Sequence, residues 1–536
     1  MRIALSRSAS VEEKPTSYYL IALVIAFCLC WLPVLLAGRF VQDDWMLLSA
    51  ASIRKIIYIH PGYAWFSLDT VDGNFRPLGT TLYFAYMLKL FGANAFAFLC
   101  GNFVINLSGC IVAFFIVREL GYSKMAGAAA SLLYLTRGLN YTENAWACAL
   151  GDGIVILLGG LAVLGILRAN KRKGPSVFGY HALAWILFCI ATFAKQSSFA
   201  IPLIVALLIL IRPGETPLVP LRRRVRHAFL ALIAYSIPVA IVFLHAKSMF
   251  RQGTPYPVSL TLDGFTRWLA YIPWYFVGIE LPGQYKVLNI LTLVAGAAIL
   301  VGLAVFVARV PRTLGKRPRD ITFLLLAALA AISPYILLPT RIAPYYGSMS
   351  AFWISLALGI ALTRFGGVAD KSPAARNAYF ALYLIVIVGA LDIRLKETGL
   401  VPSGGYIWGT FGMDTEKNNY DQIAKSLEGA PANDTLVMVN FPSYPPYYTS
   451  MALIANPGIQ RILLYDTKTN TYMGNDFNGL RPKDELGALN DVQAYHWDQP
   501  VDASEAARAI VPNQATWIEM DKGKIYRRGP LADGAN

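Results

Sequence analysis

Long apolar runs recur along the first 391 residues, and they constrain the fold more than any other feature of this chain. A helix needs about 20 apolar residues to cross the hydrocarbon core of a bilayer. Hydrophobic residues make up 56% of the sequence and charged residues 15%, whereas soluble domains carry roughly 25% charged residues. We therefore expect an all-α polytopic membrane protein with about eleven transmembrane helices. The expected spans are 18–37, 95–117, 124–137, 147–167, 180–195, 197–211, 228–246, 287–308, 321–338, 345–363 and 377–391.

The first apolar run and the cysteines indicate what kind of membrane protein this is. The run Tyr18–Leu36 follows a basic segment but lacks a small-residue cleavage site, which predicts a retained helix and not a cleaved signal peptide. The six cysteines all lie in apolar stretches, and none has the spacing of metal ligands. We expect them to be small core residues without a redox role.

The net charge of +15 would suit a nucleic-acid-binding protein, but its distribution indicates otherwise. Most of the excess lies in short loops, such as 168–173, 222–226 and 309–319. Short cytoplasmic loops of membrane proteins carry this excess of Lys and Arg. The sequence therefore predicts contact with the lipid bilayer and no nucleic acid. To keep all these loops on one side, the apolar segments 78–92 and 265–281 must be external or re-entrant.

Residues 392–536 differ from the rest of the chain in composition. They carry more acidic than basic residues and contain short β-like runs, such as Thr435–Asn440 and Arg461–Tyr465. We expect a transmembrane domain at 1–391, followed by a small external α/β domain at 392–536. The Pro-rich stretch 441–448 is expected to be a loop.

Charged side chains gather at the outer ends of the predicted helices. An Asp43-Asp44 pair follows the first span, and carboxylates at such a boundary are functional candidates, although a solvated helix end is the alternative. A structural protein has no need to place so many charges on one membrane face, whereas an enzyme that works there does. The set is Asp43, Asp44, Asp69, Asp72, Arg76, Glu143, Asp152, Lys195 and Arg341.

Three cations of this set lie at the predicted outer face, and Lys195 lies where a lipid phosphate would lie. Lys195 lies in a tight turn between two short apolar runs, at the predicted outer surface. The alternative is a lysine that merely extends along apolar surface to water. Arg76 precedes Pro77, which suits the first turn of a helix. Arg341 lies in a short external loop that also contains Tyr345.

The order of these motifs resembles the GT-C glycosyltransferases. The matching elements are Asp43-Asp44 after the first helix, Arg76-Pro77-Leu78 opening the next, Glu143-Asn144 with Gly151-Asp152, and the turn Ala194-Lys195-Gln196-Ser197. Within this superfamily the chain is most similar to relatives of protein O-mannosyltransferases and of TPR-containing transmembrane O-mannosyltransferases, over about residues 18–365. It departs from them at Gln196, where the family has an acidic residue, and in the tail, which shows no TPR period.

The resemblance implies a sugar donor on a polyprenyl monophosphate and a single displacement that inverts the anomeric carbon. It implies that Asp43 is the base and that Asp44 orients the acceptor or supports Asp43. The phosphate would be bound by Lys195 and Arg341, with Arg76 as a further candidate. Sugar and acceptor groups would be held by Glu143, Asp152 and Tyr345. No cofactor or metal site is predicted, but a carboxylate-held divalent ion remains an alternative because oligosaccharide-transferring relatives use one.

Two other functions fit a membrane protein with an external domain. A transporter or flippase of lipid-linked sugars would place charges at the middle of the membrane, often in inverted repeats, and this sequence shows neither. A non-catalytic glycan-assembly protein would explain the tail but not the ordered charges. The acceptor could be a protein, a lipid-linked glycan or a cell-wall polymer. The charge pattern suits a bacterial inner membrane with the site facing the periplasm.

Overall fold

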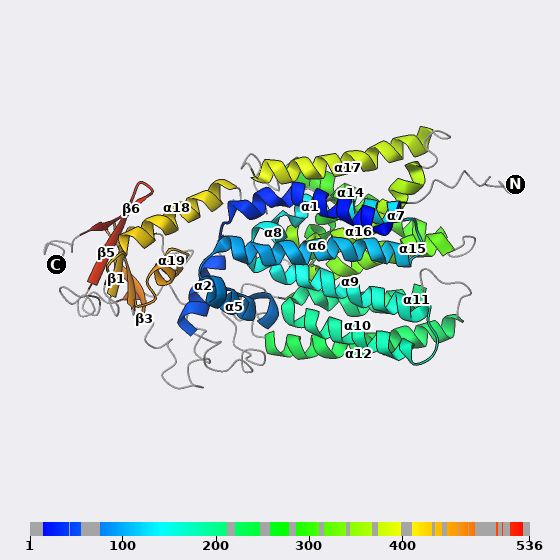
Figure 1. Cartoon of the computed structure of the whole chain (residues 1–536), viewed down its shortest axis with the longest axis horizontal. Helices are drawn as coiled ribbons and strands as arrows, with labels where there is room; N and C mark the ends of the chain where they lie inside the picture. Colours follow the sequence, from blue (N-terminus) through cyan, green and yellow to red (C-terminus); the bar gives the residue numbers. More distant parts are fainter. Residues whose placement is uncertain are drawn as a thin grey trace.

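The computed structural model confirms a helical bundle with a small C-terminal sheet (Figure 1). It describes residues 14–41, 43–54, 76–211, 220–246, 258–277, 286–309, 316–338, 344–366, 373–397, 410–430, 435–441, 447–459, 461–469, 471–476, 500–501, 506 and 515–528.

Every span predicted from the sequence is helical in the structure. Among the described residues, 6 stretches are long and apolar enough to cross a membrane. They contain α1 (Thr16–Ala37), α6 (Ala95–Glu119), α9 (Leu150–Asn170), α10 (Ser176–Ala194), α12 (Leu221–Ala246) and most of α15 (Lys316–Ile332). Shorter apolar stretches lie in α11 (Ile201–Ile211), α14 (Lys286–Arg309) and α16 (Ser348–Gly366). The remaining predicted spans correspond to α7 (Lys124–Leu135) and α17 (Pro373–Glu397). The chain is a multi-pass membrane protein.

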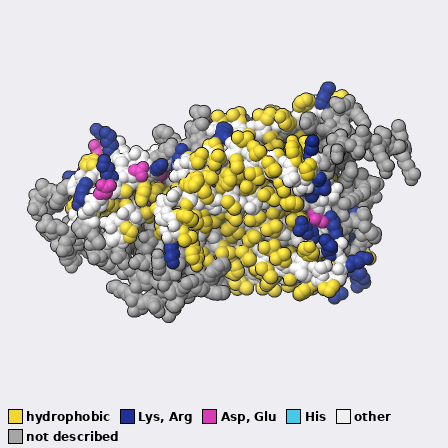
Figure 2. All heavy atoms as spheres, in the orientation of Figure 1, with side chains coloured by type: hydrophobic (Ala, Val, Ile, Leu, Met, Phe, Trp, Pro, Cys, Tyr) yellow, Lys and Arg dark blue, Asp and Glu magenta, His cyan; other side chains and the backbone are white. Residues whose placement is uncertain are grey.

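An apolar belt surrounds the middle of the bundle (Figure 2). Large apolar side chains are exposed on its surface, including Leu29 on α1 and Ile237 on α12. Lys and Arg gather beyond the belt at the right-hand end of the view, and the C-terminal sheet lies beyond the left-hand end. This arrangement agrees with the predicted orientation, in which the basic loops share one side of the membrane.

Small residues let the central helices approach closely, as is common in membrane bundles. A Cβ added at Gly160 of α9 would lie 2.8 Å from Cγ1 of Val112 on α6. A Cβ at Gly359 of α16 would lie 2.3 Å from the backbone nitrogen of Ala130 on α7. Helices α6, α7, α9 and α16 therefore form a tightly packed centre.

A layer of short helices covers the end of the bundle next to the sheet (Figure 1). It consists of α2 (Asp43–Arg54), the π-helix η1 (Pro77–Thr81), α5 (Leu82–Phe91), η2 (Gly138–Asn140), α8 (Tyr141–Ala145), η3 (Ala147–Ala149) and η4 (Gln196–Ala200). The segment predicted as an external or re-entrant helix thus forms η1 and α5. The other such segment forms α13 (Leu262–Val277), which packs against α14. Two further short helices, η7 (Ser333–Leu337) and η8 (Pro344–Gly347), come later in the chain, after α15.

The C-terminal domain is a six-stranded sheet in the order β4-β3-β2-β1-β5-β6. Its strands are β1 (Thr435–Val439), β2 (Arg461–Asp466), β3 (Thr471–Asp476), β4 (Pro500–Val501), β5 (Ala515–Asp521) and β6 (Lys524–Arg528). β1 pairs in parallel with β2 and β5, and the outer pairs are antiparallel. The two β-like runs of the sequence are therefore confirmed as β1 and β2.

Two helices connect this sheet to the bundle. They are α18 (Thr410–Ser426), which packs on β6, and α19 (Tyr447–Ala455), which packs on α2. The prediction that 441–448 is entirely loop is wrong, because Tyr447 and Tyr448 begin α19. The indole Nε1 of Trp45 donates to Glu416 at 3.1 Å, and its ring stacks on Tyr420 with centroids 4.8 Å apart. Helix α2 is thus held between the bundle and the C-terminal domain. The domain boundary that the sequence predicted between residues 391 and 392 lies within α17.

At Gly79 the short helix η1 approaches the bundle closely, so a larger side chain at this position should destabilise the protein. A Cβ at this position would lie 2.2 Å from the carbonyl oxygen of Ala194, a backbone atom that cannot move aside alone. Overpacking of this kind costs about 1–3 kcal/mol, so Gly79→Ala should lower the thermal unfolding midpoint. The exposed Gly179 of α10 has no atom within 4 Å of its added Cβ, and Gly179→Ala should leave the midpoint unchanged or raise it. Equal midpoints for both variants would contradict the tight contact.

Candidate active site

The two adjacent aspartates at the start of α2 have different environments. Asp44 is fully buried, and its Oδ1 accepts the backbone N–H of Cys148 at 2.8 Å. Its Oδ2 accepts the N–H of Val41 at 3.0 Å. Burial raises the pKa of Asp44 well above the usual value of an aspartate, while these N–H groups act in the opposite direction. Asp44 therefore fastens the start of α2 to the bundle.

Asp43 is only partly buried, and it faces the C-terminal domain. Its Oδ1 lies 3.5 Å from the hydroxyl of Tyr447, which donates to it from the first turn of α19. Because neighbouring residues on a helix point in different directions, fixing Asp44 inward leaves Asp43 at the boundary between the two domains. This is the accessible carboxylate of the pair.

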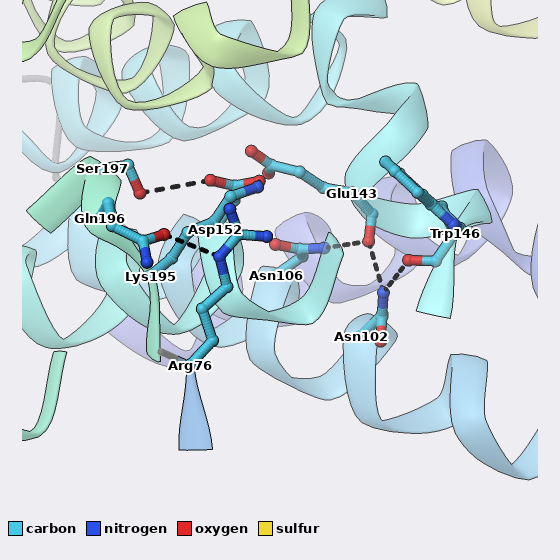
Figure 3. Close-up of polar contacts among 9 residues, drawn as sticks. All are labelled: Arg76, Asn102, Asn106, Glu143, Trp146, Asp152, Lys195, Gln196 and Ser197. Carbon is cyan, nitrogen blue, oxygen red and sulfur yellow. Dashed lines mark hydrogen bonds and ion pairs between the residues drawn. The ribbon is translucent and has the colours of Figure 1, made fainter. Parts of the chain in front are cut away.

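Lys195 is buried within the protein at the end of α10. It ends α10 in an extended conformation, with φ −164° and ψ 153°, which turns the chain into η4. Its ammonium forms an ion pair with Asp152 at the start of α9, and Ser197 Oγ donates to Oδ1 of the same aspartate at 3.2 Å (Figure 3). Both charged side chains are more than nine-tenths buried. The lysine thus points into the protein and does not extend along apolar surface to water.

Arg76 lies directly before the π-helix η1, a helix type that is frequent at functional sites. Its Nε donates to Oε1 of Gln196 at 2.7 Å (Figure 3). The residue by which this chain departs from the family pattern is therefore the acceptor that orients Arg76. The end of α10 packs closely on both η1 and α9, because a Cβ added at Gly79 or at Gly151 would overlap the carbonyl oxygen of Ala194.

Two asparagines of α6 hold the turn that carries Glu143. Asn102 Nδ2 donates to the carbonyl oxygens of Glu143 and Trp146, both at 2.8 Å. Asn106 Nδ2 donates to the Glu143 carbonyl oxygen at 3.3 Å and to Oδ1 of Asn144 at 3.2 Å. The Glu143 side chain then extends toward Asp152 (Figure 3). Burial and the neighbouring Asp152 charge raise the pKa of Glu143 to about 8.

The short helices bring the predicted carboxylates and cations to the same end of the bundle. Helix α2, which begins at Asp43 and Asp44, contacts η1 and η3. The η1 helix follows Arg76 and contacts α9 and α10, at whose ends Asp152 and Lys195 form their ion pair. The structure thus brings together residues that are up to 152 positions apart in numbering, from Asp43 to Lys195.

Some predicted residues are not placed by the structure. Arg341, Asp69 and Asp72 lie outside the described residues. Tyr345 belongs to η8, but its side chain lies outside the described part. Among the residues that are described, no three His, Cys, Asp or Glu side chains gather in a way that could hold a metal ion.

The sequence analysis missed several members of the site. Asn102 and Asn106 had a usable signal, since two amides four residues apart on one face of an apolar span must find buried partners. Ser197 lies in the lysine turn and could have been expected near Asp152. Tyr447 had no such signal, because its contact with Asp43 joins segments of opposite ends of the chain.

The raised pKa of Glu143 predicts how stability depends on pH. Between the usual glutamate pKa and about 8, the folded protein holds a proton that the unfolded chain has released. The contribution of this proton to the free energy of unfolding is therefore complete below the usual glutamate pKa, and it is lost as the pH rises to about 8. The Glu143→Gln variant cannot ionise, so its thermal midpoint should fall less than that of the wild type over this window. Parallel pH profiles would show that Glu143 is ionised in the folded protein.

No protein-family model and no curated protein matches this sequence. Solved structures with a similar arrangement include ArnT from Cupriavidus metallidurans bound to undecaprenyl phosphate, at 13% identity and a TM-score of 0.46, over 90% of this chain and 97% of that one. Archaeal oligosaccharyltransferase AglB from Archaeoglobus fulgidus, in complex with an inhibitory peptide and a dolichol-phosphate, is 12% identical with a TM-score of 0.44, over 84% of this chain and 69% of that one. Arabinofuranosyltransferase AftD from Mycobacteria is 14% identical with a TM-score of 0.41, over 80% of this chain and 30% of that one.

These three are GT-C glycosyltransferases, the superfamily that the sequence motifs resemble. A likeness at these identities and TM-scores does not decide what the chain does. The function is therefore argued from the side chains of the site.

Proposed function

We propose that this protein is an integral-membrane glycosyltransferase that moves a sugar from a polyprenyl-phosphate donor to an acceptor hydroxyl. The observation that supports this most is the packing of the short helices at one end of the bundle. Helix α2 begins with the accessible carboxylate Asp43 and contacts η1, which follows Arg76 and packs on α10, the helix that ends at Lys195. In this proposal the phosphate of a membrane lipid lies between these cations and the base.

The proposed reaction is one displacement at the anomeric carbon. Asp43 takes the proton of the acceptor hydroxyl as the oxygen forms its bond to that carbon. The bond between the anomeric carbon and the phosphate oxygen breaks, and the polyprenyl phosphate leaves with the electron pair. Arg76, Lys195 and Arg341 stabilise the charge on this oxygen. The carbon is inverted because the attack comes from the opposite side.

The remaining site residues have positioning roles in this proposal. Asp152 holds the ammonium of Lys195 in place when no donor is bound. Glu143, Asp152 and Tyr345 hold sugar or acceptor hydroxyls. A transferase that used a carboxylate-held divalent ion would lose turnover in EDTA, which the proposed reaction would not.

The C-terminal domain is proposed to form the acceptor side. Tyr447 and α19 lie against Asp43, on the side away from Lys195 and the bundle. The acceptor is a lipid-linked glycan, a cell-wall polymer or a protein that reaches this junction. We place the protein in a bacterial inner membrane with the junction facing the periplasm, since the basic loops lie at the opposite end (Figure 2).

Cysteine labelling in intact cells with a permeabilised outer membrane tests this orientation. An impermeant reagent should modify Lys468→Cys in the exposed β2–β3 turn, but should reach Lys173→Cys in the α9–α10 loop only after lysis. The reverse pattern would place the site on the cytoplasmic side.

Binding of the reaction product tests the proposed chemistry itself. Native mass spectrometry of the purified chain should detect a bound polyprenyl monophosphate, while the corresponding polyprenol, which lacks the phosphate, should dissociate. An Arg76→Gln variant should retain less of the phosphate, because the fork that contacts it is lost. Equal binding of the phosphate and the alcohol would refute the proposed site.

A further inference from the structure

A second polar pocket lies at the opposite end of the bundle from Asp43. It has a volume of about 410 Å³ and lies between α9, α10, α11 and α12. Arg172 and Arg224 line it together with His181 and His227, and none of the acidic side chains that the structure describes lines it. The pocket therefore has a positive electrostatic character at the membrane end where Lys and Arg gather.

Two polar groups in this pocket are arranged for an anion. Arg224 is held in place because its Nη1 donates to the carbonyl oxygen of Leu210, 2.5 Å away at the end of α11. Asn170 also lines the pocket, and within the described structure its buried Nδ2 has no hydrogen-bond partner. A buried donor without an acceptor costs about 1–3 kcal/mol. An oxygen atom of a bound ligand would remove that cost.

Apolar side chains of α11 and α12 also line the pocket. Leu230 and Ile209 line it. Next to Leu230, a row of exposed apolar side chains runs along α12: Phe229 at 61% exposed, Ile233 at 49% and Ile237 at 53%. A ligand that fits both parts has an anionic head and hydrocarbon tails.

We propose that this pocket binds an anionic phospholipid of the basic leaflet, with its phosphodiester among Arg172, Arg224 and Asn170 and its acyl chains along α12. Basic pockets between helices at the cytoplasmic side are suited to such head groups. The site is separate from the proposed donor site, since the two lie at opposite ends of α9. Its role is to anchor α9–α12 in one leaflet, and it does not depend on the proposed transfer reaction.

Native mass spectrometry of the full chain, titrated with phosphatidylglycerol, tests this proposal. The first bound lipid should be retained more strongly than phosphatidylcholine with the same acyl chains. The double variant Arg172→Gln/Arg224→Gln should weaken its apparent affinity by at least about tenfold, the loss of roughly one charge-assisted hydrogen bond. The matched control, Arg222→Gln/Arg223→Gln, removes the same charge from exposed positions outside the pocket and should leave the affinity unchanged.

Two further measurements separate a defined lipid site from general effects on folding or charge. Because Arg224 also holds the end of α11, the thermal midpoints of the variants are compared. The Asn170→Leu variant removes the buried amide donor without changing the charge, and it should also weaken binding. Equal losses in both double variants would show a diffuse attraction to the basic surface and overturn the site. Equal retention of phosphatidylcholine, or full competition by glycerol phosphate, which has no acyl chains, would overturn the lipid assignment.

Discussion

Replacing Asp43 with asparagine should lower turnover by about 100-fold or more, with folding intact. The asparagine side chain has nearly the same shape, and the hydrogen bonds to the backbone of Cys148 and Val41 come from Asp44. The asparagine cannot take the proton of the acceptor hydroxyl. Initial rates measured at saturating donor, together with the thermal midpoint, separate loss of the base from loss of structure.

The neighbouring Asp44→Asn variant is the matched control. Asp44 accepts the N–H groups of Cys148 and Val41, and an asparagine amide would present N–H to one of them. This variant should therefore lower the thermal midpoint, because a buried donor is left opposite another donor. Near-normal turnover of Asp43→Asn would reject Asp43 as the base, and Asp44 would be the next candidate.

The largest predicted effect on donor binding is that of Lys195→Met. A charge-assisted contact to phosphate contributes about 1.5–3 kcal/mol net, so this variant should weaken apparent donor affinity by roughly 10- to 100-fold. Lys195→Arg should keep part of the affinity, because the charge is retained but its geometry changes.

Because Lys195 forms an ion pair with Asp152, its replacement changes stability as well as donor binding, and a double variant is needed as the control. Removing Lys195 alone leaves a buried carboxylate unpaired, which costs about 3–5 kcal/mol of stability. The double variant Lys195→Met/Asp152→Asn removes both charges, so it should recover much of the stability but none of the donor affinity. If Lys195→Met binds the donor as tightly as the wild type, the phosphate role passes to Arg341 or Arg76.

The helical domain could be predicted because its signal is local. Each apolar run specifies a helix and its burial by composition alone, and the basic loops between runs indicate which ends lie together. The membrane-facing exposure of residues such as Leu29 follows from the same signal. The two β-like runs were equally readable, since buried strands of this kind consist of short apolar runs.

The internal geometry of the site could not be predicted, because it depends on contacts between distant segments. The sequence placed Asp152 and Lys195 at the same membrane end but gave no indication that they pair. Nor did it show that the turn after α10 directs Lys195 into the protein, toward Asp152. Likewise, the two aspartates of α2 differ only through what surrounds them.

The start of α19 was missed for a different reason. Pro445 and Pro446 made the stretch before it look like a connector, yet proline is also common in the first turn of a helix. Composition could not separate these two readings. The consequence is functional, because the residue that follows, Tyr447, contacts Asp43.

The central claim is that the protein breaks the bond between a sugar and a polyprenyl phosphate. The most direct measurement follows that bond by mass spectrometry in proteoliposomes that contain a polyprenyl-phosphate sugar and an envelope acceptor extract. The account predicts that polyprenyl monophosphate accumulates, that the mass of the sugar appears on an acceptor, and that Asp43→Asn abolishes both. Movement of the intact donor across the bilayer, with no release of polyprenyl phosphate, would contradict the account and identify a transporter.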